Sequence, residues 1–598
     1  MIQNGWDEDF SRLFLFWLER FDPIYFDLAY VDLARSPYSV SASSSPTVAF
    51  GRLSASLEIR CSFLLALCLA HMGVTLAMFV GRDSTNMGNT VSGGGVRLSL
   101  VSRRWSEDYV AHVLRPNFQQ AKRYLFKPLI LINKAHALML YRTNLMQLQP
   151  AAKLLTALEE IERAGSRSYT YSEVYEDLYF AVEARLIDLA GVEAGGNMQL
   201  ARSRNDIDAA MIRMVLRETL LGFIEALSEL RGVLVERALE HVDSLMPGYT
   251  HNQPAQPTTL AHYLGGVIGV LERDSRRLRF AYNTVNRNPL GAAAMTTTGF
   301  AIRRDLTATY LGFEGLAENA IDAVGGVDHT LEAVSAAMNC SVTLSRLVFD
   351  LMTWASREVG FLRVPDEFVQ ISSIMPQKRN PVVLEHTRSK LARAHGAGDT
   401  VFTLARNVPF GDINDVGEQM IEPALACFTE SDEAIHLLSA VLERAKFDTV
   451  LMNARSGEHF TTATGLADAL VAQLGLPFRQ AHHVASTLVD IAYRDGIAPS
   501  QVTAAHLEQA AVQTLGRELG VTDEFVTRAL DPRAFVDART LPGGPARAAM
   551  QPFLERARQT LSEDNTWHRA ENSRLRRAVD ALEGEIDAVL REQVAVSV

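Results

Sequence analysis

Residues 372–381 bring together several polar groups that could do chemistry, in the order Ser-Ser-Ile-Met-Pro-Gln-Lys-Arg-Asn-Pro. Two adjacent hydroxyls could remove a proton, while a lysine and an asparagine could stabilise negative charge. Pro376 disfavours helix at the residue before it, and Asn380 followed by Pro381 is typical of a helix start. The segment is therefore predicted to be a polar loop that leads into a helix, and such loops often carry catalytic groups.

The lysine of this segment stands out against the composition of the chain. Of 58 basic residues only seven are lysines, so arginine is the usual cation here. A lysine in a loop therefore indicates, weakly, a place where a compact ammonium group is needed. The alternative is an ordinary surface turn in which Lys378 is a solvated cation.

A second polar cluster, Ser203-Arg204-Asn205-Asp206, opens a long stretch of helical pattern. One interpretation is a helix cap, in which Ser203 or Asn205 holds the first turn and Asp206 favours the helix dipole. The other is a binding site for a carboxylate, because the fork of an arginine matches that group.

A third cluster, Thr250-His251-Asn252-Gln253, lies in a polar break between two apolar helical stretches. A lone histidine in a loop is usually structural, yet histidine can also titrate near neutral pH, and Gln253 adds a neutral donor and acceptor. Glu385 falls on the first turns of the helix predicted after Asn380. It could complement the helix dipole, or it could orient a histidine and raise its basicity.

Other kinds of site are poorly supported by the sequence. No Gly-x-Ser-x-Gly elbow surrounds Ser372, which argues against a serine nucleophile. The run Gly93-Gly94-Gly95 lacks the lysine and hydroxyl of a phosphate-binding loop. The pair His482-His483 has no carboxylates at metal spacing, so we interpret it as structural.

The composition indicates a soluble globular protein. The net charge of −12 and the lack of zinc-finger motifs give no sign of nucleic-acid binding. Four scattered cysteines predict a reducing, cytoplasmic location. Residues 61–81 are almost uncharged and near the length of a bilayer span, but a histidine and two glycines weaken that interpretation, so membrane attachment is not favoured.

Helical periodicity dominates from residue 101 onward. Apolar residues recur at three- and four-residue spacing in six long stretches: 107–162, 206–243, 258–285, 328–358, 383–406 and 419–445. The stretch 208–238 is apolar on more than one face, which predicts burial on most faces. Several such helices indicate a bundle that completes its core with other subunits. Residues 1–86 are different: they are rich in serine and aromatic residues and contain no lysine.

These segments resemble, in order along the chain, the motifs of a known enzyme family. The loop ISSIMPQKRNP is similar to the signature of the fumarase/aspartase superfamily, usually Gly-Ser-Ser-x-Met-Pro-x-Lys-x-Asn-Pro. Four other stretches resemble argininosuccinate lyase: EDLYFAVEARLIDLAG, ARSRNDIDAAMIRM, PGYTHNQPAQPTTLAHYL and FVDARTLPGGPA. The resemblance covers roughly residues 90–560 and does not include 1–86.

The resemblance implies an all-α fold of three domains with a long central helical bundle. The expected parts are an N-terminal extension of unknown order, an N-terminal lyase domain, the central bundle domain, a small helical C-terminal domain and a C-terminal helical tail: residues 1–86, 87–205, 206–448, 449–560 and 561–598. The resemblance further implies a homotetramer with a twenty-helix core, in which each active site takes its polar clusters from three subunits.

The resemblance also implies a reaction on a small-molecule substrate, the elimination of fumarate from an N-substituted aspartate such as argininosuccinate, with no metal or organic cofactor. Ser372 would remove the proton beside a carboxylate, and Lys378 would stabilise the extra negative charge that follows. His251, paired with Glu385, would serve the leaving nitrogen. The remaining expected contacts are with the substrate, from Ser203, Arg204, Asn205, Thr250, Gln253, Ser373, Met375 and Asn380.

Several positions depart from the family pattern. Ile371 stands where a glycine precedes the serine pair, and Tyr179 stands where a histidine follows Glu-Asp-Leu. Asp412, Gly417 and Met420 occupy places where the family supplies a tyrosine, a glutamine and a lysine to the amino-acid part of argininosuccinate. These departures resemble a side branch that includes ethylenediamine-disuccinate lyase, so another amine is an open alternative. A non-catalytic, crystallin-like relative is a further one.

Overall fold

The structure, a computed structural model, describes residues 105–597. The hydrophobic run 61–81, the extension 1–86 and the first residues of the predicted lyase domain lie outside this range. Helices dominate what is described, as the periodicity predicts. None of the helices in 105–597 combines the length and the hydrophobicity that crossing a bilayer requires.

Between residues 105 and 200 the structure has six α-helices, and five of them, α5 to α9, contribute to one hydrophobic core. Its largest members, α6 and α7, contribute Ile130, Leu138 and Leu158, which are completely buried. Helix α8 begins after Asp177, whose carboxylate accepts a hydrogen bond from the amide of Phe180 at 3.0 Å. The bounds are α4 Glu107–Tyr109, α5 Arg115–Tyr124, α6 Phe126–Arg142, α7 Leu148–Ala164, α8 Leu178–Ala190 and α9 Val192–Gly195.

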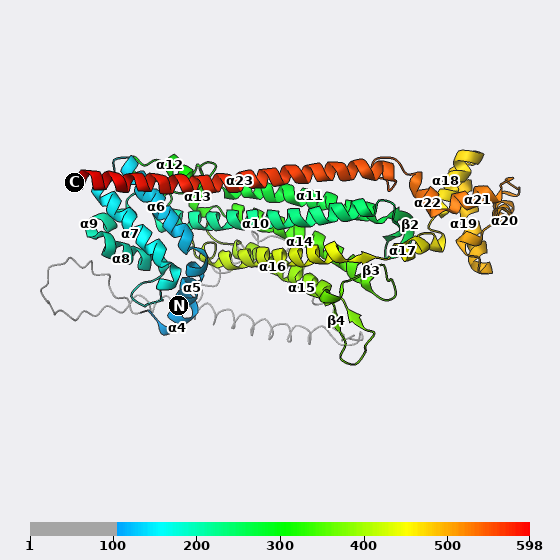
Figure 1. The fold of residues 1–598 in the computed structure, drawn as a ribbon, viewed down its shortest axis with the longest axis horizontal. Helices are drawn as coiled ribbons and strands as arrows, with labels where there is room; N and C mark the ends of the chain where they lie inside the picture. Colours follow the sequence, from blue (N-terminus) through cyan, green and yellow to red (C-terminus); the bar gives the residue numbers. More distant parts are fainter. Residues whose placement is uncertain (1–104, 598) are drawn as a thin grey trace, which may run out of the picture. The chain divides into compact units, whose positions relative to one another are not determined.

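Five long helices run side by side to form the central bundle (Figure 1). They share a second core, which is built mostly of leucine, alanine, valine and isoleucine, with several phenylalanine and methionine side chains. The helical stretches predicted from periodicity are confirmed here. The bounds are α10 Arg204–Glu240, α11 Leu260–Val285, α14 Asp328–Ala355, α15 Val382–Leu404 and α16 Glu418–Arg444, with the short helices α12 Arg304–Leu311 and α13 Ala320–Gly325 between α11 and α14.

Three short antiparallel ribbons connect the helices, and the sequence did not predict them. The longest joins α10 to α11 and pairs Leu245 with Thr259 and Thr250 with Gln253. The second, β4 with β5, carries the loop of residues 372–378 at its tip. The bounds are β1 Leu245–Thr250 with β2 Gln253–Thr259, β3 Leu362–Arg363 with β6 Lys446–Phe447, and β4 Gln370–Ile371 with β5 Arg379–Asn380.

Six shorter helices make up the C-terminal part, and four of them, α18 to α21, share a separate hydrophobic core. Several of its helices end at glycines with positive φ, among them Gly475 at 68° and Gly496 at 66°, the usual helix C-cap geometry. The bounds are α17 Thr449–Ser456, α18 Ala463–Leu474, α19 Phe478–Asp495, α20 Ala504–Leu515, α21 Asp523–Leu530 and α22 Pro532–Asp537.

The last helix, α23 (Arg547–Ser597), joins two of these cores. Its first turns bury Leu554 in the bundle core, and its last turns bury Leu582 and Ile586 in the N-terminal core. Lys134 of α6 is almost fully buried and binds Glu583 at 2.8 Å. The helix runs unbroken through residue 560, where a boundary between C-terminal domain and tail was expected.

Candidate functional site

The first polar cluster forms the start of α10. Ser203 caps the helix: its hydroxyl accepts from the amide of Asn205 at 3.4 Å, and its own amide donates to Asp206 at 3.0 Å. The cap interpretation is therefore confirmed, with Ser203 as the capping residue. The Asn205 side chain donates to the carbonyl of Ala294 at 3.1 Å. Ser203 and Asn205 remain half-buried, so both side chains can still meet a ligand.

Asp206 has a role that the sequence alone did not show. Its side chain is fully buried, and one carboxylate oxygen accepts from the amides of Gly291 at 2.8 Å and Ala293 at 2.9 Å. The other oxygen holds the amide of Ser203. Asp206 thus fixes the small-residue loop after Asn288 against the start of α10, beside Asn205.

Arg204 is bound within its own chain by carboxylates. It forms an ion pair with Asp177 at 2.6 Å and lies 3.7 Å from Asp208 and 3.8 Å from Glu418. Burial raises the pKa of Asp208 to about 7; Arg204 opposes this rise, whereas Asp177, Glu418 and Asp412 add to it. Carboxylates therefore outnumber the cation in this cluster, which leaves Arg204 little capacity for a substrate carboxylate.

The second cluster lies at the tip of the β1–β2 ribbon. His251 and Asn252 have φ values of 53° and 58°, and Thr250 pairs with Gln253 across them. Positive φ at both central residues is the type I′ hairpin geometry. Residues other than glycine are uncommon in this conformation, although asparagine and histidine adopt it more often than most, and such positions are often functional. Thr250, His251 and Gln253 are all exposed.

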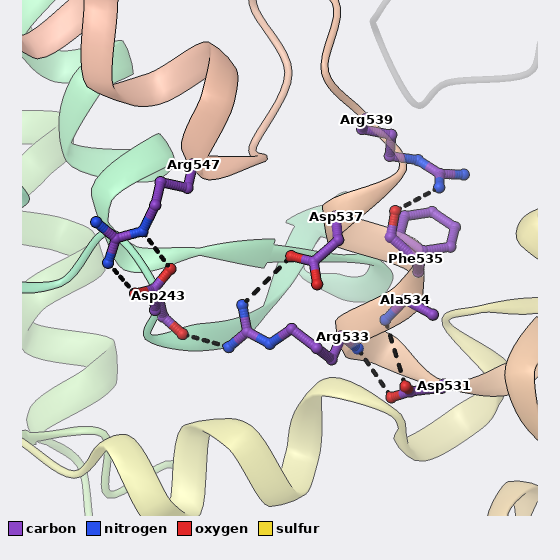
Figure 2. A network of polar contacts seen from close by, with 8 residues as sticks. All are labelled: Asp243, Asp531, Arg533, Ala534, Phe535, Asp537, Arg539 and Arg547. Carbon is purple, nitrogen blue, oxygen red and sulfur yellow. Dashed lines mark hydrogen bonds and ion pairs between the residues drawn. The ribbon is translucent and has the colours of Figure 1, made fainter.

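The base of the same ribbon is held by the charged cluster of Figure 2. Arg547 donates from Nε to Oδ1 of Asp243 at 3.2 Å and from Nη2 to the other oxygen, and it holds the pKa of Asp243 below its usual range. Arg533 donates to the carbonyl of Asp243 at 2.5 Å. Leu245 of β1 is buried against Phe535 of α22. The C-terminal helices therefore anchor the ribbon that presents His251.

The third cluster is a loop, as the position of its proline predicts, and it lies at the tip of the β4–β5 hairpin, which the sequence did not predict. Met375 and Lys378 close a turn, with the Lys378 amide donating to the Met375 carbonyl at 3.0 Å and Pro376 at the second turn position. The Ser372 hydroxyl oxygen accepts from two amides, those of Ile374 at 3.4 Å and Met375 at 3.1 Å. Ser373 is exposed, and Met375 is 38% exposed.

The entry into α15 differs from the expectation. Asn380 does not cap the helix but pairs with Gln370 in the ribbon, so α15 begins at Val382 with Pro381 at the cap position. The Asn380 side chain instead accepts from the ammonium of Lys378. Glu385 is exposed on the first turn of α15.

Within one protomer the first two clusters are far apart. Asn205 lies at the start of α10, and the ribbon with His251 follows its end. A helix of 37 residues spans about 55 Å at the usual rise per residue. The third cluster lies on a separate hairpin next to the start of α15 (Figure 1). One protomer therefore cannot bring residues 205 and 251 to the same small molecule.

Some residues of these clusters were missed because their partners are distant in the sequence. Asp177 binds an arginine 27 positions later, and Asp243 binds one about 300 positions later. For Asp177 the available signal was a carboxylate beside an apolar helical pattern, since such groups are rarely buried without a partner. Asp243 is more than half exposed, so burial gave no such signal for it.

Comparisons with known proteins identify the family and the fold that this chain is similar to. Residues 119–396 match the family described as Lyase, and residues 460–537 match the family Argininosuccinate lyase C-terminal. Argininosuccinate lyase 1 of Shouchella clausii is 36% identical over 77% of this chain and 92% of its own length. The argininosuccinate lyase of Methanoculleus marisnigri is 38% identical over 77% and 93%. The crystal structure of EDDS lyase in complex with formate superposes with a TM-score of 0.74, at 29% identity over 80% of this chain and 96% of that one.

Proposed function

The chain belongs to the argininosuccinate lyase family, and we propose from that premise that it releases fumarate from argininosuccinate by breaking a carbon–nitrogen bond. A base removes a proton from the carbon beside one carboxylate of the succinyl group. The electron pair moves first into that carboxylate and then forms the double bond of fumarate as the nitrogen leaves. The nitrogen takes up a proton, so the products are fumarate and arginine.

Ser372 is the base in this proposal. Its oxygen already accepts two backbone N–H groups, and hydrogen bonds of this kind stabilise an oxygen that has lost its proton. The nearby Lys378 adds a positive charge on the same loop. Two fixed amides and an ammonium group provide the preorganised environment that makes a serine alkoxide accessible.

The other polar groups stabilise the intermediate, bind the substrate or give a proton to the leaving nitrogen. Lys378 and Asn380, which are already hydrogen-bonded to each other, stabilise the doubly charged carboxylate of the intermediate. Ser203 and Asn205 bind the carboxylates of the substrate, together with Thr250. His251, exposed at the ribbon tip, gives its proton to the leaving nitrogen, and Glu385 of another protomer orients it. Ser373, Met375 and Gln253 line the same site.

We propose that the site forms in a homotetramer, in which copies of the bundle meet. The separation of residues 205 and 251 along α10 requires more than one protomer. Large apolar side chains on the bundle surface supply a contact area: Phe280 is 65% exposed, Phe349 52% and Phe402 38%. Side chains of this kind are favoured at interfaces between subunits. A cytoplasmic location fits an enzyme of this kind.

The observation that carries the proposal is that the three polar clusters, which follow one another in the family's order, all remain accessible: Ser203 and Asn205 are half-buried, and His251 and Ser373 are exposed. The test is the absorbance of fumarate released from argininosuccinate by the purified protein. Ser372→Ala should abolish the release, whereas Ser389→Ala, an exposed serine on α15, should not change it. A Ser372→Ala protein with wild-type turnover would refute the role of this base.

A second candidate differs only in the amine. Asp177, Asp208 and Glu418 gather around Arg204, which follows Ser203 and precedes Asn205, and Asp412 lies near enough to Asp208 to raise its pKa further. A carboxylate-rich surface attracts an amine with an extra positive charge and repels the carboxylate of an amino acid. A diamine adduct, as for an EDDS lyase, is therefore the alternative substrate.

The two candidates are separated by incubating the protein with fumarate and either arginine or ethylenediamine, and weighing the products by mass spectrometry. An adduct with ethylenediamine alone would select the second candidate. An adduct with arginine alone would select the first.

A further inference from the structure

The first turn of helix α8 contacts the cluster Ser203–Asp206 at the start of α10. Asp177, which caps α8, binds Arg204 at 2.6 Å. Tyr179 follows two residues later and is 7% exposed. The guanidinium of Arg204 also lies over the Tyr179 ring, 5.7 Å from its centre. One turn of α8 therefore contacts the residue that separates Ser203 from Asn205.

The hydroxyl of Tyr179 reaches the other side of the cluster. It donates to the side-chain oxygen of Gln199, and the same oxygen accepts from Nε of Arg202 at 3.3 Å. Arg202 is 9% exposed, and its Nη1 donates to Asn133 of α6 at 2.7 Å. Arg202 immediately precedes Ser203, so this chain of bonds ends at the capping residue of α10.

The two sets of contacts bracket Ser203. Arg204 is held from one side by Asp177, and Arg202 is held from the other by Gln199 and Asn133. Tyr179 is the side chain that contacts both, with its ring under Arg204 and its hydroxyl on Gln199. Neither arginine can move far without disturbing this residue.

We propose that Tyr179 is a positioning residue that sets the backbone of residues 202–205 for binding a substrate carboxylate. This inference rests on the proposed function, in which Ser203 and Asn205 bind the succinyl carboxylates. Tyr179 itself touches no substrate. It acts by fixing the start of α10 through Gln199 and Arg202.

The hydroxyl of a tyrosine is better suited to donating a hydrogen bond to Gln199 than the ring of the histidine that the family has at this position. Burial raises the pKa of Tyr179 to about 12, so its hydroxyl keeps its proton throughout the neutral range and always donates. The departure of this position from the family pattern is therefore compatible with an active enzyme, since the hydroxyl supplies a permanent donor to Gln199.

The test is Tyr179→Phe, with Tyr310→Phe as the matched control. Tyr310 is 4% exposed in the same core, and its hydroxyl donates to Glu585 at 3.0 Å, away from residues 202–205. Both changes remove one hydroxyl from a buried tyrosine. Only the first removes it from the network behind Ser203.

The first measurement is amide hydrogen exchange of the peptide 199–206 in the free protein. Tyr179→Phe should raise its exchange rate about fivefold, while Tyr310→Phe should leave it unchanged. The second measurement is steady-state kinetics, in which Tyr179→Phe should raise KM about tenfold and leave kcat within about twofold. In the Tyr179→His protein the exchange rate of this peptide should remain above the wild-type rate, because an imidazole nitrogen does not extend as far toward Gln199 as the tyrosine hydroxyl.

Two results would overturn the inference: exchange at 199–206 that equals the wild-type rate in Tyr179→Phe, or equal KM changes in both tyrosine variants. Failure of the proposed function gives a different result, because a wild-type protein that releases no fumarate from any aspartate adduct refutes the reaction. The exchange comparison decides the role of Tyr179 in either case.

Discussion

Replacing Asp206 should loosen the carboxylate-binding cluster more than any other single change nearby. Its two oxygens accept three backbone N–H groups, those of Ser203 at 3.0 Å, Gly291 at 2.8 Å and Ala293 at 2.9 Å. The side chain has no exposed area, so water cannot replace a lost bond. Burial raises the pKa of this carboxyl, and the three donors act in the opposite direction.

The size of the effect follows from these contacts. Asp206→Asn keeps one oxygen, which can still accept from Gly291 and Ala293, but its NH2 then faces the Ser203 amide. An unpaired buried donor costs roughly 1–3 kcal/mol, and exchanging a charged acceptor for a neutral one costs about 1 kcal/mol for the remaining pair. The sum is about 3 kcal/mol. Asp206→Ala leaves all three amides unpaired and should cost about twice as much.

Amide hydrogen exchange measures the free energy of local opening at the amides of Gly291 and Ala293. A loss of about 3 kcal/mol corresponds to roughly hundredfold faster exchange at Gly291 and Ala293 when these amides exchange by local opening. The kcat/KM for fumarate release should fall at least about tenfold. Asp523→Ala is the control, because it removes a carboxylate that accepts the amide of Ala504 at 2.6 Å in the C-terminal part.

The control should leave both exchange in residues 289–294 and kcat/KM unchanged. Wild-type exchange at Gly291 and Ala293 in the Asp206→Asn protein would show that these bonds do not hold the loop. Faster exchange with unchanged kcat/KM would show that the loop is held but does not support the site.

Three further predictions concern charged groups elsewhere. Burial raises the pKa of Asp208 in the folded protein to about 7, above its value in the unfolded chain, so the folded state loses stability as the pH rises from about 4 to 7. Asp208→Asn should therefore raise the melting temperature at pH 8 but not below pH 4, and an equal gain at both pH values would contradict this. Asp564 binds the buried Arg231 at 2.6 Å, so Asp564→Ala should lower the free energy of unfolding by roughly 3–5 kcal/mol. Denaturant titration measures this loss, and a value below about 1 kcal/mol would contradict the importance of this ion pair. Asp243 and Arg547 are both more than half exposed, so Asp243→Asn should cost less than about 1 kcal/mol of stability yet lower kcat by misplacing the ribbon; a large melting shift with normal kcat would be the opposite result.

The long helices were predictable because each carries its own signals. For α10 these are a serine cap, an aspartate three residues later and apolar residues on several faces, and the structure has the capping box and the buried faces. The predicted stretch 206–243 and the observed Arg204–Glu240 differ only at the ends, where helix boundaries are least well determined by sequence.

The ribbon and the cap of α15 were not predictable because distant residues decide them. Residues 245–259 contain three prolines and no regular alternation, so pairing is not visible locally; the anchor from Arg533 and Arg547 comes from the C-terminal part. Asn380 is a good cap in isolation, but pairing with Gln370 draws it into a strand.

The polar clusters themselves could be selected from the sequence, whereas their geometry could not. Ser372, His251 and Asn205 were chosen for their residue types and neighbours. That Arg204 is bound by three carboxylates depends on residues as far away as Glu418, and no local pattern indicates such a contact.

The central claim is that residues from different protomers form one active site, and mixing two inactive variants tests it most directly. Asn205→Ala and Ser372→Ala proteins, each inactive alone, are dissociated, mixed in equal amounts and reassembled. If the two residues act at one site from different subunits, random assembly makes about a quarter of the sites wholly intact, and about a quarter of wild-type fumarate release returns. If both residues served a site within one protomer, no mixture would contain an intact site, and the mixture would stay as inactive as its components.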